Sequence, residues 1–196
     1  MPKIVDHEQR KAEITKIVLK SIGKNGLANT TIRGISREGG FSSGTLAHYF
    51  SDKDELMNFA FNAVSKDTHE RMRERAARYG KAIDKLRVVI EELTPNEDAN
   101  LDSQISLAFW DAARLDSRLL GKFREVYEEL RGHVRKFIGE GIESGELNSQ
   151  LDVELEVDFI VALCDGFLVS FLLDPERFTA ERRDHVISFA LSRLER

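Results

Sequence analysis

The chain has 196 residues, 41% of them hydrophobic and 32% charged, and its formal net charge is −5 at pH 7. This balance is typical of a globular protein, and no stretch approaches the roughly 18 apolar residues of a membrane helix. The only cysteine, Cys164, excludes an intrachain disulfide and a multi-cysteine metal site, and we expect a small buried hydrophobe there. Residues 1–6 carry neither a signal-peptide nor a transit-peptide pattern, so we expect a cytoplasmic protein without a membrane partner.

The first predicted helix covers about residues 7–24. Ile14, Val18 and Ile22 recur at helical spacing and form one apolar stripe, and Asn25-Gly26 ends the helix. A helix with a single apolar stripe buries that face against its neighbours, so we expect it to brace the elements that follow.

Two short helices come next. Thr30-Thr31 caps the first, which Gly39-Gly40 ends, and Ser42 caps the second, which runs through about Tyr49. Two short helices joined by a glycine-containing turn and braced by a preceding helix are the parts of a helix-turn-helix.

Longer helices make up the rest of the chain. Asp52, with Glu55 three residues later, forms a capping-box variant that opens the first of them. Apolar spacing places these helices over about residues 52–79, 82–93, 101–114, 117–144, 153–173 and 179–195. The sequence therefore predicts an all-α fold of about nine helices. The helix over 153–173 is apolar on nearly every face, so we expect its own domain and a second subunit to bury it.

Charge is divided unevenly between the two ends of the chain. Residues 1–53 hold nine Lys and Arg against five Asp and Glu, a net of +4, whereas residues 54–196 hold twenty against twenty-nine, a net of −9. A basic end on an acidic chain suggests that this end meets phosphates.

The core pattern of the short helices supports a DNA-binding module. Ile35, Phe41, Leu46 and Phe50 can close a miniature core. The polar residues of the second short helix then face outward, namely Ser42, Ser43, Thr45, His48 and Tyr49. Hydroxyl groups at a helix start can reach phosphates or base edges, and Gly44 permits a close approach. A small helical bundle with a polar surface is the alternative.

Residues 31–56, TIRGISREGGFSSGTLAHYFSDKDEL, resemble the N-terminal signature of TetR-family repressors. The resemblance covers about residues 10–60. It includes the hydroxyl residue that opens the first short helix, the Gly-apolar-Ser-x-Gly turn, the aromatic end of the second and the lysine that opens the long helix. Ser36 and Gly39 stand where alanine is usual, and Ala47 replaces a tyrosine that touches the DNA backbone.

The resemblance implies a set of DNA contacts. It assigns phosphate contacts to Thr31, Tyr49 and Lys53, and it brings Arg33, Ser43, Thr45 and His48 nearer the bases, with Ser42 and Gly44 beside them. A cation is unfavourable beside a helix N-terminus, which supports a phosphate partner for Lys53. Packing beneath the module is the alternative role for His48.

The C-terminal half has no catalytic signature. Within this half, Gly-rich phosphate loops, His-x-x-x-His pairs and Gly-x-Ser-x-Gly elbows do not occur, so we expect neither an enzyme nor a cofactor. Leu107-Ala108-Phe109-Trp110 and Asp165-Gly166-Phe167 resemble the betaine-operon repressor subgroup, which implies a sensing role and a homodimer. We do not predict choline as the effector, because the sequence has no surplus of aromatic residues that would form a cage around an ammonium group.

An effector pocket is expected among the middle helices. Its candidate residues are Phe109, Trp110, Asp111, Arg114, Phe123, Tyr127 and Asp165. Plain core packing is the alternative for the aromatic residues. Asp111 and Arg114 can pair with each other or anchor a ligand, and a buried carboxylate at Asp165 needs a hydrogen-bond partner or a ligand.

The sequence thus predicts a ligand-responsive repressor that binds a palindromic DNA operator as a homodimer and is released by a small molecule. The predicted domains are a helix-turn-helix over 1–54 and a sensing and dimerisation domain over 55–196. The predicted dimer interface consists of Phe159, Leu163, Phe167, Phe171, Ile187, Leu191 and Leu194. The alternatives are a helical small-molecule or lipid-binding protein or enzyme without DNA binding, and a helical adaptor that binds only protein.

Overall fold

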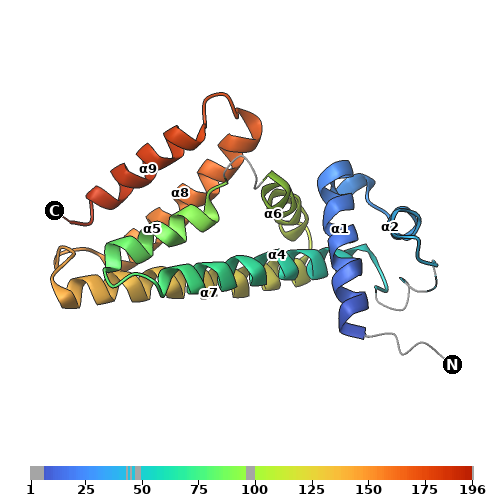
Figure 1. The fold of residues 1–196 in the computed structure, drawn as a ribbon, viewed down its shortest axis with the longest axis horizontal. Coiled ribbons are helices and arrows are strands. Elements are labelled where there is room, and N and C mark those ends of the chain that lie inside the picture. The colour runs from blue at the N-terminus through green and yellow to red at the C-terminus, as the bar shows by residue number, and fades with distance from the viewer. Residues whose placement is uncertain (1–6, 43, 45, 47–49, 96–99, 196) are drawn as a thin grey trace. The chain divides into compact units, whose positions relative to one another are not determined.

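The fold is given by a computed structural model that describes residues 7–42, 44, 46, 50–95 and 100–195. Within these ranges it is all-helical, as predicted, and has eight labelled helices (Figure 1). They are α1 (His7–Asn29), α2 (Ile32–Gly39), α4 (Lys53–Ala76), α5 (Ala82–Leu93), α6 (Asn100–Ala113), α7 (Ser117–Ser144), α8 (Val153–Leu173) and α9 (Ala180–Ser192). None of the helices in these ranges is both long and apolar enough to cross a membrane.

The chain packs as two compact units. Unit 1 consists of residues 1–64 and 104–122, and unit 2 consists of residues 65–103 and 123–196. Three helices, α4, α6 and α7, have residues in both units. These two units are defined by how the chain packs. The predicted boundary after residue 54 instead separates a DNA-binding domain from a sensing domain, and it stays a prediction.

The core of unit 1 confirms the predicted helix-turn-helix packing. The α1 stripe of Ile14, Val18 and Ile22 is buried in one cluster with Ile35 of α2. The same cluster holds Leu46, Phe50, Leu56, Ala60, Val64 and Ile105, and Phe41 packs against it. Ile105 belongs to α6, so a helix distant in sequence completes the core of the N-terminal module.

Two glycines shape the turns of unit 1. Gly26 has φ 71° and breaks the helical path of α1, close to the predicted end of that helix. The buried hydroxyl of Thr30 donates a 2.8 Å hydrogen bond to the Gly26 carbonyl, which fixes the chain just before α2. Gly40 has φ 64° and ends α2 as predicted, because only glycine adopts this conformation without strain.

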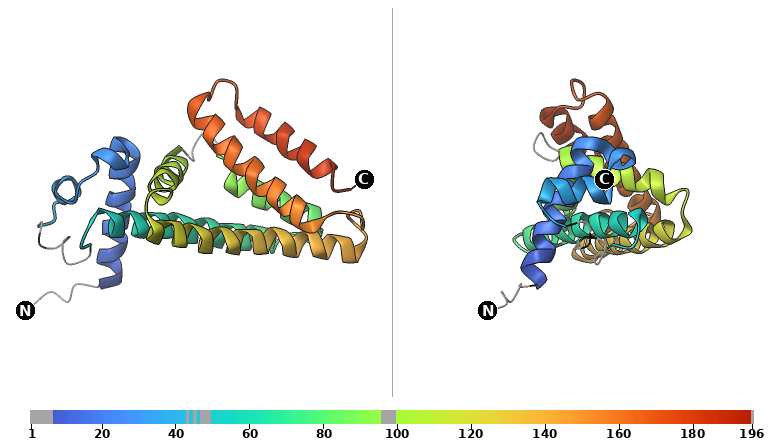
Figure 2. Two further views of the ribbon diagram at one scale, coloured as in Figure 1. Left: turned by 180° about the vertical axis from the view of Figure 1, so that it is seen from behind. Right: turned by 90° about the vertical axis from the view of Figure 1, so that its right-hand side faces the viewer.

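Unit 2 is a bundle in which α5 packs against both α8 and α9 (Figure 2). The side chain of Lys85 on α5 donates a 2.7 Å hydrogen bond to Glu140 on α7. Cys164 of α8 is buried, as predicted, and burial raises the pKa of its thiol well above the usual range.

The apolar helix α8 is not buried on every side within its own chain. Leu155 and Leu173 are 64% and 77% exposed, and Phe189 of α9 is 71% exposed. These side chains give α8 and α9 apolar surface that the rest of the described chain leaves uncovered.

Candidate functional site

The start of α2 presents two of the predicted DNA-binding residues. Thr31 is the N-cap of α2, and its hydroxyl oxygen accepts a 3.0 Å hydrogen bond from the backbone N–H of Gly34. Both Thr31 and Arg33 are exposed. The helix N-terminus adds unpaired N–H groups and a positive dipole end, so this corner of unit 1 suits an anion.

The second short helix is described only in part. Ser42 and Gly44 are exposed, and Leu46 donates a backbone hydrogen bond of 3.4 Å to the Ser42 carbonyl. Ser43, Thr45, His48 and Tyr49 lie outside the described residues, as does the side chain of Lys53.

The start of α4 is fixed by the predicted cap. Asp52 Oδ1 accepts a 2.8 Å hydrogen bond from the N–H of Glu55, and Glu55 accepts one of 2.7 Å from the N–H of Ser51. The hydrogen bonds from the Ser51 backbone and hydroxyl lower the pKa of Glu55. This reciprocal arrangement confirms the capping-box variant and holds Lys53 in the first turn of α4.

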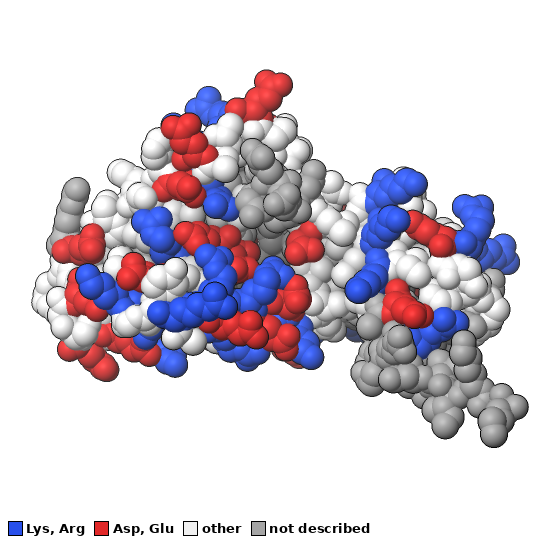
Figure 3. Space-filling model, in the orientation of Figure 1, with Lys and Arg blue, Asp and Glu red and all other residues white. Residues whose placement is uncertain are grey.

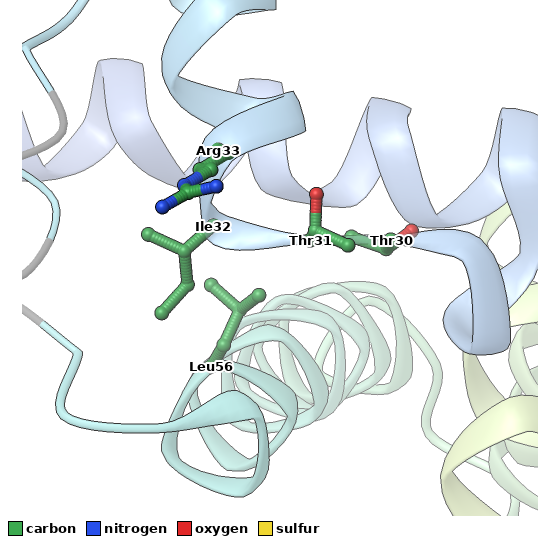
Figure 4. A pocket seen from close by; sticks show the side chains of 5 residues that line it. All are labelled: Thr30, Thr31, Ile32, Arg33 and Leu56. Atoms are coloured by element: carbon green, nitrogen blue, oxygen red, sulfur yellow. The ribbon is translucent and has the colours of Figure 1, made fainter.

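A cavity of about 300 Å³ opens beside the start of α2 (Figure 4). Ile32 and Leu56 give it apolar walls, and Thr30, Thr31 and Arg33 also line it. None of these lining residues belongs to the predicted effector pocket. The cavity therefore belongs to the helix-turn-helix region of unit 1.

Surface charge follows the division seen in the sequence. On the face drawn in Figure 3, Lys and Arg side chains predominate over α1 and α2, whereas over unit 2 they intermix with Asp and Glu. The exposed basic residues of α1 and α2 include Lys16, Lys20, Lys24, Arg33 and Arg37. Unit 1 thus has the electrostatic character of a surface that meets phosphates.

The predicted effector residues fall into two groups, and the first lies on α6 in unit 1. Phe109 is fully buried and stacks on Phe61 of α4, with ring centroids 3.7 Å apart. Trp110 is half-buried. Asp111 and Arg114 are exposed and pair with each other at 2.9 Å, which is the first of the two roles open to them.

The second group lies on α7 and α8 in unit 2. Phe123 stacks on Tyr127 with ring centroids 4.0 Å apart, and the Tyr127 hydroxyl donates a 2.8 Å hydrogen bond to Asp165 Oδ1. The hydrogen-bond partner expected for Asp165 is therefore Tyr127. Burial raises the pKa of Asp165 to about 6, although the hydrogen bond and the nearby Arg131 guanidinium act against that rise.

Most of the predicted dimer-interface residues are buried within their own chain. Only Phe159 and Leu163 remain half-buried. The other residues are 1–8% exposed, namely Phe167, Phe171, Ile187, Leu191 and Leu194. The surface available to a second subunit consists instead of neighbouring exposed residues of α8 and α9.

Sequence reasoning missed a histidine pair in unit 2. His69 of α4 and His133 of α7 flank the carboxylate of Glu129, and His69 is 6% exposed. The spacing of four between Glu129 and His133 was a local signal, whereas nothing in the sequence pointed to His69. In the described part of the chain, no cluster of three or more His, Cys, Asp and Glu residues is arranged to hold a metal ion.

A helix-turn-helix core with a basic surface, joined to a larger helical unit, defines a DNA-binding regulator with a separate sensing domain. Residues 18–58 match the model of bacterial regulatory proteins, tetR family, and residues 82–195 match that of the BetI-type transcriptional repressor, C-terminal. The chain therefore belongs to the tetR family. It is a transcriptional regulator with a DNA-binding and a ligand-binding domain, and not an enzyme.

Individual relatives agree with this assignment. The chain is 31% identical over 188 residues to the HTH-type transcriptional regulator PksA of Bacillus subtilis. This alignment covers 95% of this chain and 90% of PksA. A TetR transcription regulator of Haloarcula marismortui shares the fold at a TM-score of 0.86 and 20% identity, over 96% of this chain and 100% of its own. FadR of Bacillus subtilis, which was solved with stearoyl-CoA, shares the fold at a TM-score of 0.80 and 22% identity. That match covers 92% of this chain and 97% of the FadR chain.

Proposed function

We propose that this regulator is a cytoplasmic repressor that binds a palindromic operator as a homodimer and leaves it when a small-molecule effector binds. The observation that carries this proposal is the start of α2, where exposed Thr31 and Arg33 stand over a helix-turn-helix core. The basic surface of α1 and α2 on an otherwise acidic chain supports it.

The proposed DNA contacts follow from the elements that carry them. Thr31 and Lys53 contact phosphates, because a helix start favours anions. Tyr49, at the end of the second short helix, contacts a phosphate as the resemblance to the family signature implies. Arg33, Ser43, Thr45 and His48 lie nearer the bases, and Ser42 and Gly44 allow the second short helix to approach the groove.

The proposed dimer uses the exposed apolar side chains of α8 and α9. Leu155, Leu173 and Phe189 are each more than 60% exposed. Phe159 of α8 is half-buried, and the Arg193 guanidinium lies over its ring at 4.2 Å. Exposed apolar side chains on adjacent helices are typical of a subunit interface. A twofold dimer presents two reading helices to two half-sites about 34–36 Å apart.

The proposed effector site lies in unit 2 around Phe123, Tyr127 and Asp165. Two stacked rings provide an apolar wall, and a partly buried carboxylate hydrogen-bonded to a phenol provides polar recognition, which is the usual composition of a ligand site. Because α4, α6 and α7 continue from unit 2 into unit 1, a ligand that shifts these helices alters the DNA-binding unit. FadR of Bacillus subtilis was solved with stearoyl-CoA, which supports a ligand role for the helical domain of this fold.

The experiment that tests the function is a binding titration of the full chain with the palindromic DNA upstream of its own gene. We expect binding that weakens steeply with salt and that is lost with a fragment whose half-sites are scrambled. Equal affinity for the palindrome and the scrambled fragment would contradict operator recognition.

A further inference from the structure

Two histidines, the buried His69 and the half-buried His133, lie between α4 and α7 in unit 2. His69 Nδ1 on α4 lies 3.3 Å from Glu129 Oε2 on α7. The His133 ring, one helical turn after Glu129, stands edge to face against the His69 ring with centroids 5.8 Å apart, and its Nε2 lies 4.0 Å from Glu129 Oε1. Two imidazoles on different helices therefore share one carboxylate.

The surroundings of the pair disfavour additional positive charge. The Nε2 atom of His133 is buried without a hydrogen-bond partner among the described residues. Burial lowers the pKa of both histidines, and Arg73 of α4 acts on both in the same direction. The His69 ring and Lys136 of α7 lower the pKa of His133 further. Glu129 opposes this effect, but it is 53% exposed, and solvent weakens its attraction.

We propose that the His69–His133 pair makes the packing of α4 on α7 sensitive to protons, so that acidification loosens these helices and lowers the affinity of the regulator for DNA. A first proton places an imidazolium in a largely buried site, and a second places two like charges on rings 5.8 Å apart. The effect on DNA rests on the proposed function, because it requires that α4, which begins in unit 1, carries the change.

The direction of the effect follows from the lowered pKa values of the two histidines. As the pH falls below 6.5, the ordinary histidine value, the unfolded chain takes up protons before the folded chain does. The stability that the neutral pair contributes is therefore complete above that pH and is lost as the pH falls toward the lowered pKa values. Each unit by which a pKa is lowered corresponds to about a tenfold change in the unfolding equilibrium constant.

The test compares the full chain with His69→Gln, His133→Gln and the double variant between about pH 5.5 and about pH 7.5. The matched control is His185→Gln, since His185 is exposed on α9. We expect wild type and His185→Gln to lose thermal stability and DNA affinity on acidification, and the double variant to lose most of this dependence. Full acid dependence in the double variant would overturn the proposal.

A proton NMR titration of the wild-type imidazoles tests the pair without any variant, which matters if a glutamine variant fails to fold. We expect midpoints below 6.5 for both rings. Two independent titrations at the ordinary value would overturn the proposal, as would DNA affinity that stays constant while the pair titrates. Absence of DNA binding at every pH would instead contradict the proposed function. In that case the NMR and unfolding measurements would still test whether protonation of the pair loosens the packing of α4 on α7.

Discussion

The hydroxyl of Tyr127 on α7 donates a 2.8 Å hydrogen bond to Oδ1 of Asp165 on α8. Burial raises the pKa of Asp165 to about 6, and of the two effects that oppose this rise the hydrogen bond from Tyr127 is the larger. Asp165 is therefore ionised at neutral pH in spite of its burial. A single phenol helps to hold a charged group inside the proposed effector site.

Replacing Tyr127 by phenylalanine should destabilise the protein more at high pH than at low pH. Without the hydrogen bond the pKa of Asp165 rises further, and a carboxylate without this donor costs about 1–3 kcal/mol where it is charged. Denaturant unfolding should show a larger loss at about pH 8 than at about pH 5, where the carboxyl is protonated. Tyr79→Phe, at a tyrosine 44% exposed, serves as the control. A loss independent of pH would contradict this account.

Asp165→Asn should abolish the response to effector without weakening DNA binding in its absence. For a compound found by screening for a change in Trp110 fluorescence, the factor by which it weakens DNA binding must equal the factor by which DNA weakens its binding, typically about 5–150-fold. Asp111→Asn, at an exposed aspartate, should respond like wild type. An unchanged response in Asp165→Asn would remove Asp165 from the effector site.

Ser36 and Gly39, the two departures from the usual alanines in α2, should respond in opposite directions to substitution. Ser36 Oγ is buried without a hydrogen-bond partner in the described chain, so Ser36→Ala should stabilise by about 1 kcal/mol. A Cβ at Gly39 would lie 2.5 Å from the Phe41 ring, and the Arg10 guanidinium covers that ring at 4.6 Å from its centroid. Because the added methyl group would have to displace this ring, Gly39→Ala should destabilise the protein by about 1–3 kcal/mol.

The control for Gly39→Ala is Gly121→Ala in α7, where no atom lies within 4 Å of an added Cβ. That substitution should stabilise slightly, by about 0.5–1 kcal/mol, because alanine favours a helix interior. Thermal unfolding separates these outcomes, and a stabilising Gly39→Ala would show that Phe41 moves aside freely.

Phe189→Glu should yield monomers by sedimentation velocity and weaken operator binding, because a charge at an apolar interface has no partner. Leu115→Glu is the matched control, since Leu115 is 73% exposed but lies in unit 1, whereas Phe189 is 71% exposed on α9. Phe171→Glu is a poor test of dimerisation, because Phe171 is buried within its own chain and the substitution threatens folding. A dimeric Phe189→Glu protein would move the interface elsewhere.

Local chemistry made the helices predictable. Thr31 and Asp52 cap α2 and α4 through hydrogen bonds that span three residues, and the periodic apolar stripe of α1 is buried as the spacing requires. The residues that resemble a family signature identified the DNA-binding module for the same reason, since its core and turns are contiguous in sequence.

Contacts between distant segments were not predictable. His69 contacts Glu129, which lies sixty positions later in the sequence, and Phe61 of α4 stacks on Phe109 of α6. No local sequence pattern predicts either contact. In α8 the apolar residues surround the helix, so periodicity indicates no inward face. For this reason Phe167 and Phe171, predicted for the dimer interface, lie inside the subunit.

The salt dependence of operator binding by wild type and Lys53→Ala tests the central claim most directly. A phosphate contact releases counterions and carries no base information, so Lys53→Ala should weaken operator and non-operator DNA together and reduce the salt slope by about 1. Lys66→Ala, at an exposed lysine of unit 2 paired with Glu70, should leave the slope unchanged. An unchanged slope in Lys53→Ala, or the same reduction in both variants, would contradict a DNA surface at the start of α4.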